Sequence, residues 1–120
     1  MSEAKKPPFA LDERTALFAA EIRKFVRQLP KSISNIEDGK QIVRSSGSVG
    51  ANYLEARDAL SRKDFAMRVK ISRKEASETR YWLRLLDVPK ELAQTRITLA
   101  DEAEQLIKIL TAIAKKADHS

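Results

Sequence analysis

The sequence predicts an all-α protein folded as an antiparallel, up-down-up-down four-helix bundle. Of its 120 residues, 42% are hydrophobic and 33% are charged, with only three Gly and four Pro, a composition typical of a helix-rich globular domain. Apolar residues recur at steps of three and four positions in four segments, and no segment has the two-residue period of a strand. Short links between these segments favour an antiparallel bundle. We expect one domain over residues 11–118, preceded by a mobile tail over residues 1–10.

The first helix is expected from about Asp12 to Gln28, and Pro30 ends it. Acidic residues near its start and basic residues near its end suit the helix dipole. After a short link over residues 31–34, Ser34 or Asn35 is expected to cap the next helix. The apolar face of the first helix consists of Leu11, Phe18, Ile22, Phe25 and Leu29.

The second and third helices, over about residues 36–60 and 62–86, are expected to form a long antiparallel hairpin that the rest of the chain completes. Ser61 lies three residues before Asp64, a spacing that caps the start of the third helix. The turn is therefore placed at residues 60–62. The core positions are Ile42, Val49, Tyr53, Ala56 and Leu60 in the second helix, and Phe65, Val69, Ala76, Thr79, Leu83 and Leu86 in the third.

The second helix contains Gly39, Gly47 and Gly50, each of which costs about 1 kcal/mol relative to Ala inside a helix. The run Ser-Ser-Gly-Ser-Val-Gly-Ala at residues 45–51 suggests a compensation, because side chains this small let another helix approach closely. The alternative is a flexible loop over residues 45–50 that divides the helix. The apolar spacing continues across this run, which favours an unbroken helix.

The third helix ends at Asp87-Val88-Pro89, because the residue before a proline is driven out of helical geometry. Residues 90–97 are expected to connect to a fourth helix that begins after Thr98 and continues to about Lys116. The apolar face of this helix consists of Leu99, Ala103, Leu106, Leu110, Ile113 and Ala117.

Polar residues flank the apolar positions of the hairpin and are expected to form a network between the two helices. A turn near Ser61 predicts the facing pairs Glu55 with Arg68, Ser48 with Glu75, and Arg44 with Glu78 or Thr79. We interpret the network as structural, because paired polar groups can fix the register of two helices. Its members are Arg44, Ser48, Asn52, Glu55, Arg68, Glu75 and Glu78.

The alternative interpretation of this network is a carboxylate site, in which Glu55, Glu75 and Glu78 hold a divalent cation or act as acid and base. Di-metal helical bundles add Glu-x-x-His pairs, whereas the one histidine here is His119. The chain has no Cys, no nucleophile with a base beside it, and no phosphate-binding glycine loop. We therefore expect no enzyme activity, metal site, cofactor or small-molecule substrate.

The formal net charge of +6 favours an acidic partner, most often nucleic acid. Much of it lies on the third helix, where six cations share the face turned away from the core and Tyr81 lies among them. Tyr81 can stack on a base or pack on lysine stems. A solvated surface is the alternative to a nucleic-acid-binding face. The cations are Lys63, Lys70, Arg73, Lys74, Arg80 and Arg84.

Ile71, Trp82 and Leu85 form a second apolar strip on the third helix, outside its core face. A Trp on such a strip is typical of a subunit contact, so these residues are expected to form a homo-oligomer interface. No apolar run approaches the length of a membrane span, and the first eight residues lack an apolar signal core. We therefore expect a cytoplasmic protein that does not bind a membrane.

Three segments of the hairpin together resemble a known family: Arg-Ser-Ser-Gly-Ser-Val-Gly-Ala-Asn-Tyr-Leu-Glu-Ala at residues 44–56, Asp64-Phe65, and Lys-Glu-Ala-Ser-Glu-Thr-Arg-Tyr-Trp-Leu-Arg-Leu-Leu at residues 74–86. They are similar to bacterial four-helix bundle proteins encoded in the intervening sequences of 23S rRNA genes, which are related to the accessory proteins of diversity-generating retroelements. The resemblance implies a ring-like homopentamer, and in the related branch an association with nucleic acid. It also implies that the polar network is a signature of the fold.

These observations lead to two functional hypotheses. The first is a non-enzymatic, pentameric helical scaffold that contacts nucleic acid, RNA in particular, through the basic face of the third helix. The alternative is a structural or protein-interaction module that binds an acidic protein and has no nucleic-acid role.

Overall fold

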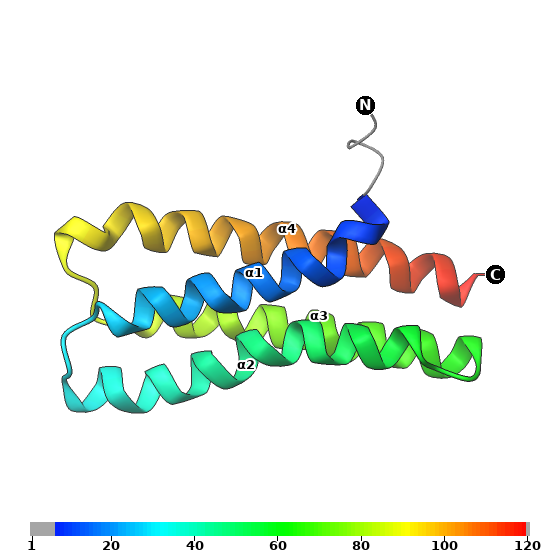
Figure 1. The fold of residues 1–120 in the computed structure, drawn as a ribbon, viewed down its shortest axis with the longest axis horizontal. Coiled ribbons are helices and arrows are strands. Elements are labelled where there is room, and N and C mark those ends of the chain that lie inside the picture. The colour runs from blue at the N-terminus through cyan, green and yellow to red at the C-terminus, as the bar shows by residue number, and fades with distance from the viewer. Residues whose placement is uncertain (1–6, 120) are drawn as a thin grey trace.

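The computed structural model describes residues 7–119, so the part of the expected tail at residues 1–6 lies outside the described residues. Four α-helices follow one another: α1 (Pro7–Arg27), α2 (Ile33–Arg57), α3 (Arg62–Leu85) and α4 (Ala93–Asp118), with one 3₁₀ turn, η2 (Lys90–Leu92), before α4. The α1–α2 and α3–α4 connections lie at one end of the bundle and the α2–α3 turn at the other (Figure 1). The predicted all-α, up-down-up-down bundle is therefore confirmed.

The apolar faces of all four helices meet in one core, and the predicted core positions are nearly all buried. Leu60 is the clear error, because its side chain is 100% exposed. The helix α2 ends at Arg57, three residues earlier than expected, so Leu60 lies in the turn and no longer follows the helical face. Towards the end of α4, Ala114 is buried, whereas Ile113 and Ala117 are only half-buried.

Three of the four helices begin earlier than the sequence suggested, whereas α3 begins at Arg62 as expected. The helix α1 starts at Pro7, not Asp12, which is compatible with proline because N–H groups in the first turn have no intrahelical partner. The helix α2 starts at Ile33 and is capped by Ser32, whose hydroxyl accepts the Asn35 N–H at 3.1 Å. The prediction of a cap at Ser34 or Asn35 was wrong. The helix α4 includes most of the expected connector.

Asn35 does not cap α2 because its side chain joins the two connections at one end of the bundle. The side chain is 4% exposed, and its Nδ2 donates to the carbonyls of Pro30 and Asp87, both at 3.0 Å. Its Oδ1 accepts the backbone N–H of Asp87 at 2.8 Å. These three bonds fix the start of α2 against the end of α3.

The helix α2 is continuous through residues 45–50, so the alternative of a loop in this segment is excluded. Two hydroxyl contacts join this run to α3: the hydroxyls of Ser45 and Thr79 lie 2.8 Å apart, and the Ser72 hydroxyl of α3 donates to the Val49 carbonyl at 2.6 Å. No buried side-chain nitrogen or oxygen of the described residues lacks a partner. The predicted close approach of the two helices is thereby confirmed.

The glycines of the same run face α1. A Cβ on Gly50 would lie 2.7 Å from the Oγ1 of Thr15, whose side chain is buried, whereas a Cβ on Gly47 would meet only the tip of Arg23, at 3.1 Å. The α1 helix is also held by two ion pairs, one from Asp12 to Arg57 on α2 at 2.6 Å and one from Arg14 to Glu102 on α4 at 2.7 Å. Small residues of α2 therefore allow close contact with both α1 and α3.

No helix in the described part of the chain contains a segment both long and apolar enough to span a membrane.

The contrast between the two glycines can be tested by making the same substitution at each. Gly50→Ala should lower the free energy of unfolding by about 1–3 kcal/mol, because Thr15 cannot yield without moving α1. Gly47→Ala should be neutral or stabilise by up to about 1 kcal/mol, because Ala favours the helix and the Arg23 tip can move. Urea unfolding followed by circular dichroism measures both. Equal effects of the two substitutions would contradict the close α1–α2 contact at Gly50.

Candidate functional site

The helix α3 carries the cation-rich surface predicted from the sequence. Its 24 residues contain eight Lys and Arg but only three Asp and Glu, so this helix alone supplies most of the formal net charge. Arg73 is half-buried, and the five other predicted cations of this face are exposed. Tyr81 lies among them and is 51% exposed. We call this set of six cations the α3 stripe.

Two cations of the α3 stripe are already neutralised by α4. The Nζ of Lys70 lies 2.9 Å from Oδ2 of Asp118, and Arg80 pairs with Glu104. Sequence reasoning missed both pairs, because the spacing within one helix does not reveal which acids of another helix lie beside it.

The four remaining cations of the stripe are Lys63, Arg73, Lys74 and Arg84. Their side chains form no hydrogen bond or ion pair with any described residue. Two cations of the stripe are therefore neutralised by α4, and four have no counter-charge among the described residues.

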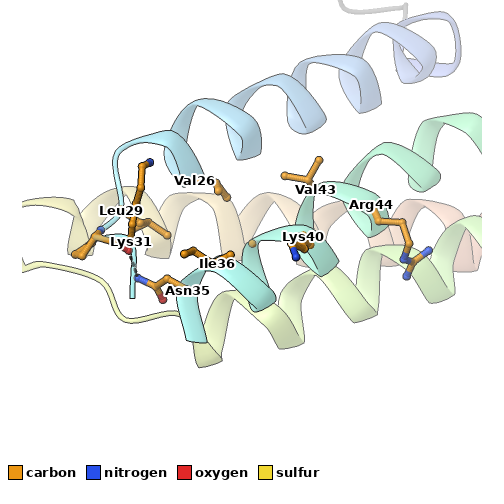
Figure 2. Close-up of a pocket in the computed structure, with 10 residues that line it drawn as sticks. Val26, Leu29, Lys31, Asn35, Ile36, Lys40, Val43 and Arg44 are labelled. Atoms are coloured by element: carbon orange, nitrogen blue, oxygen red, sulfur yellow. Dashed lines mark hydrogen bonds between the residues drawn. The ribbon is translucent and has the colours of Figure 1, made fainter. Parts of the chain in front are cut away.

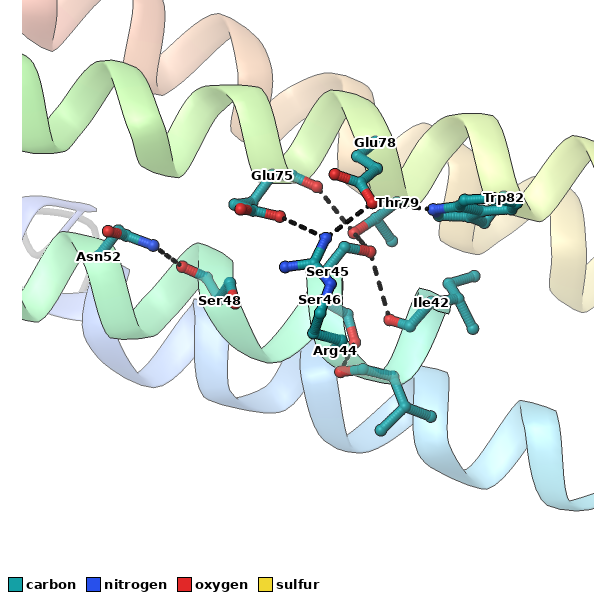
Figure 3. A network of polar contacts seen from close by, with 11 residues as sticks. Ile42, Arg44, Ser45, Ser46, Ser48, Asn52, Glu75, Glu78, Thr79 and Trp82 are labelled. Carbon is teal, nitrogen blue, oxygen red and sulfur yellow. Dashed lines mark hydrogen bonds and ion pairs between the residues drawn. The ribbon is translucent and has the colours of Figure 1, made fainter. Parts of the chain in front are cut away.

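The predicted polar network forms around Arg44 of α2 (Figure 3). Its guanidinium contacts Glu75 Oε1 at 3.2 Å and Glu78 Oε2 at 2.7 Å, which confirms the expected pairing of Arg44 with Glu78. The indole N–H of Trp82 donates to the same Glu78 oxygen at 3.0 Å. The Trp82 hydrogen bond and the contact with Arg44 lower the pKa of Glu78 against the opposing effect of partial burial, and the two carboxylates raise the pKa of Arg44.

The other predicted members do not join this network. Asn52 donates to the Ser48 carbonyl within α2 at 2.9 Å, and no hydrogen bond or ion pair among the described residues joins Glu55 to Arg68 or Ser48 to Glu75. Glu55 is exposed to solvent, although it lies within about 20° of Arg44 around the axis of α2. Arg44 already pairs with Glu75, so Ser48 is not its partner.

The alternative interpretation, a metal site formed by Glu55, Glu75 and Glu78, finds no support in the geometry. No group of three or more His, Cys, Asp or Glu within residues 7–119 is placed to hold an ion. Glu75 and Glu78 converge on Arg44, and Glu55 lies elsewhere. Arg44 therefore joins these two carboxylates of α3 to α2.

The predicted interface strip lies beside the α3 stripe. Leu85 is exposed, whereas Ile71 and Trp82 are half-buried, and Trp82 also packs against the core. Met67 extends the strip with an exposed side chain that sequence reasoning did not single out. The rings of Tyr81 and Trp82 meet edge to face, with centroids 5.2 Å apart and planes at 65°. The strip and the stripe are therefore in direct contact through this aromatic pair.

A groove between the end of α1 and the start of α2 was not predicted (Figure 2). It has a volume of about 530 Å³, and its lining includes Val26, Leu29, Ile36, Gly39 and Val43 together with Lys31, Lys40 and Arg44. Gly39 is one of its lining residues, and a Cβ there would lie 3.3 Å from the Val26 side chain.

The fold and these surfaces define a class: a small four-helix bundle whose α2 and α3 meet through small hydroxyl residues and whose third helix carries an outward basic face. The model of the 23S rRNA-intervening sequence protein family matches residues 11–112, and the chain belongs to this family. A solved structure of a protein of unknown function from the S23 ribosomal protein family of Bacteroides thetaiotaomicron is 33% identical, with a TM-score of 0.77 over 88% of this chain and 96% of that one. A comparison with curated proteins found no significant match.

The Glu78 contacts predict a pH-dependent signal from Trp82, the one Trp of the chain. Because folding lowers the pKa of Glu78 from its ordinary value of 4.5, the stability gained from its contacts is present above pH 4.5. It is lost as the pH falls through the lowered pKa of the folded state. Trp82 fluorescence should therefore be constant above pH 4.5 and should change at lower pH.

The matched variants are Glu78→Ala and Glu75→Ala. Glu78→Ala should change the Trp82 emission at neutral pH and abolish the acidic transition, because the indole loses its acceptor. Glu75→Ala removes a carboxylate on the same Arg44 but leaves the indole bond intact, so the emission should be retained. An acidic transition that persists in Glu78→Ala would contradict the assignment.

Proposed function

We propose that this protein is a non-enzymatic, homo-oligomeric scaffold that contacts RNA through the α3 stripe in the cytoplasm. The observation that carries the proposal is the set of four unpaired cations along one helix, Lys63, Arg73, Lys74 and Arg84. Paired cations already have a counter-charge, whereas unpaired ones gain most from a phosphate. The proposal therefore places the contact on these four cations.

The shape of the stripe suits a phosphate backbone better than a small anion. Lys63 and Arg84 are separated by 21 helical positions, or about 32 Å along the axis at 1.5 Å per residue. Charges distributed over such a length match a series of phosphates, and each neutralised phosphate releases counterions. Contact of this kind does not depend on base sequence.

The proposed assembly rests on the apolar strip beside the stripe. Met67 and Leu85 are exposed although they lie on a folded helix, and burial in a second copy would remove them from water. A ring of five copies is what the family resemblance implies. The family name links these proteins to 23S rRNA intervening sequences, which favours RNA over DNA as the partner.

Reversal of the unpaired charges should separate RNA binding from folding. The triple variant Arg73→Glu, Lys74→Glu, Arg84→Glu should bind RNA at least about 10-fold more weakly, and the slope of log affinity against log salt should fall by about two to three. The control reverses Lys24, Arg27 and Lys31, three exposed cations on α1 and the link that follows. This control changes the net charge by the same amount as the α3 variant, but it should reduce RNA affinity much less.

Sedimentation of each variant at micromolar concentration checks that the assembly, expected to exceed a monomer, is unchanged. Equal losses in both triple variants, or an RNA affinity that ignores salt, would contradict the proposal. Unchanged RNA binding in the α3 variant would instead favour an acidic protein as the partner of this face.

Removal of the α4 counter-charges should have the opposite effect. In the double variant Glu104→Gln, Asp118→Asn, Arg80 and Lys70 lose their partners. These cations then become available to phosphates, so RNA affinity should rise and the salt slope should steepen by up to about two. Fluorescence anisotropy with a labelled RNA measures both quantities.

The control for this gain is Glu13→Gln, Glu21→Gln, which removes two exposed acids on α1. It makes the same change in net charge, so a similar gain in this control would show that α4 does not act locally on the stripe.

A further inference from the structure

Tyr81 is an exposed aromatic ring among cations. The positions of its neighbours on α3 indicate which class of nucleic acid this face would bind. On a helix, residues three and seven positions away share a side. Arg84 lies three positions after Tyr81 and Lys74 seven positions before it, and both are unpaired among the described residues. Arg84 and Lys74 are about 15 Å apart along the axis, with the exposed ring between them.

The ring of Tyr81 is held in place by a series of contacts. It meets Trp82 edge to face, and the Trp82 indole is itself held by its hydrogen bond to Glu78 and by packing against the core. Glu78 is fixed in turn by Arg44 of α2 (Figure 3). An exposed ring that is already oriented loses little conformational freedom when a ligand covers it.

The charge near the ring also favours an anionic ligand. Glu78 is the carboxylate one turn before Tyr81, and Arg44 neutralises it at 2.7 Å. Lys74, one turn before Glu78, forms no ion pair among the described residues. The local balance around Tyr81 is therefore positive.

We propose that Tyr81 is a stacking platform for an unpaired base, so that the α3 stripe prefers single-stranded RNA or unpaired loops to a continuous duplex. Lys74 and Arg84 hold the phosphates on either side of the stacked nucleotide. In a duplex the bases are stacked on one another and offer no free face to a surface ring, whereas an unpaired base can rotate onto it. Cations alone would not make this distinction, because phosphates are present in both forms. This inference rests on the proposed function.

The test compares one short unstructured oligoribonucleotide with the same strand annealed to its complement, each titrated into the full chain. Tyr81→Ala should weaken binding of the single strand by between about 5-fold and 100-fold, with little change for the duplex. Tyr81→Phe keeps the ring and should retain the wild-type preference. Leu17→Ala, on an exposed apolar side chain of α1 that belongs to neither the stripe nor the strip, is the control and should change neither affinity.

Trp82 provides a second readout that requires no label. Because its ring contacts Tyr81, the single strand should change its fluorescence, and the duplex should change it much less. Equal losses for both probes in Tyr81→Ala, or no loss for either, would overturn this inference. If the wild-type chain binds neither probe, the proposed function itself fails. If reversal of Arg73, Lys74 and Arg84 weakens RNA binding while Tyr81→Ala does not, the α3 stripe is supported as the RNA contact and stacking on Tyr81 is rejected.

Discussion

The close contact between α2 and α3 is the constraint on which the rest of the molecule depends. Ser72 donates to a backbone carbonyl of α2 at 2.6 Å, which is possible only where two helices approach closely, and the Ser45–Thr79 pair fills the next contact along the interface. Buried hydroxyls without such partners would cost about 1–3 kcal/mol each. The interface therefore allows essentially one rotation of α3 about its axis. That rotation decides which side chains of α3 face solvent.

With the rotation of α3 fixed, each of its sides has a separate role. One side meets α2 through the hydroxyls and the Arg44 network, and another meets α4 through Lys70 and Arg80. The side left over carries Tyr81, and the unpaired Lys63 and Lys74 lie within about 20° of it around the helix axis. The Arg44 network lies between the first and last of these sides, because Trp82 connects Glu78 to the ring of Tyr81. The network was predicted to fix the register of α2 and α3, and it also orients the exposed ring of Tyr81.

The predictable features were those whose partners lie close along the chain. The apolar spacing gave the helices, and the Ser61 cap needed only Asp64, three residues on, whose N–H it accepts at 3.0 Å. Asn35 was misassigned because its carbonyl and N–H partners at Asp87 lie 52 positions away. The counter-charges on α4 were missed for the same reason. Long-range contacts depend on how helices are placed around the core, and the pattern of one segment does not contain that information.

The partial neutralisation of the stripe is consistent with a surface that acts in several copies. Under the proposed function, a single stripe with four unpaired cations would give a modest, salt-sensitive affinity for RNA, since each phosphate contact contributes little at physiological ionic strength. In a homo-oligomer every copy presents the same stripe, and a long RNA that has bound one copy meets the next at high effective concentration. Under those conditions strong individual stripes would hold any polyanion without discrimination. Weak electrostatic contacts leave room for an interaction that depends on the form of the RNA, and the oriented ring of Tyr81 is the group on this face that can supply it.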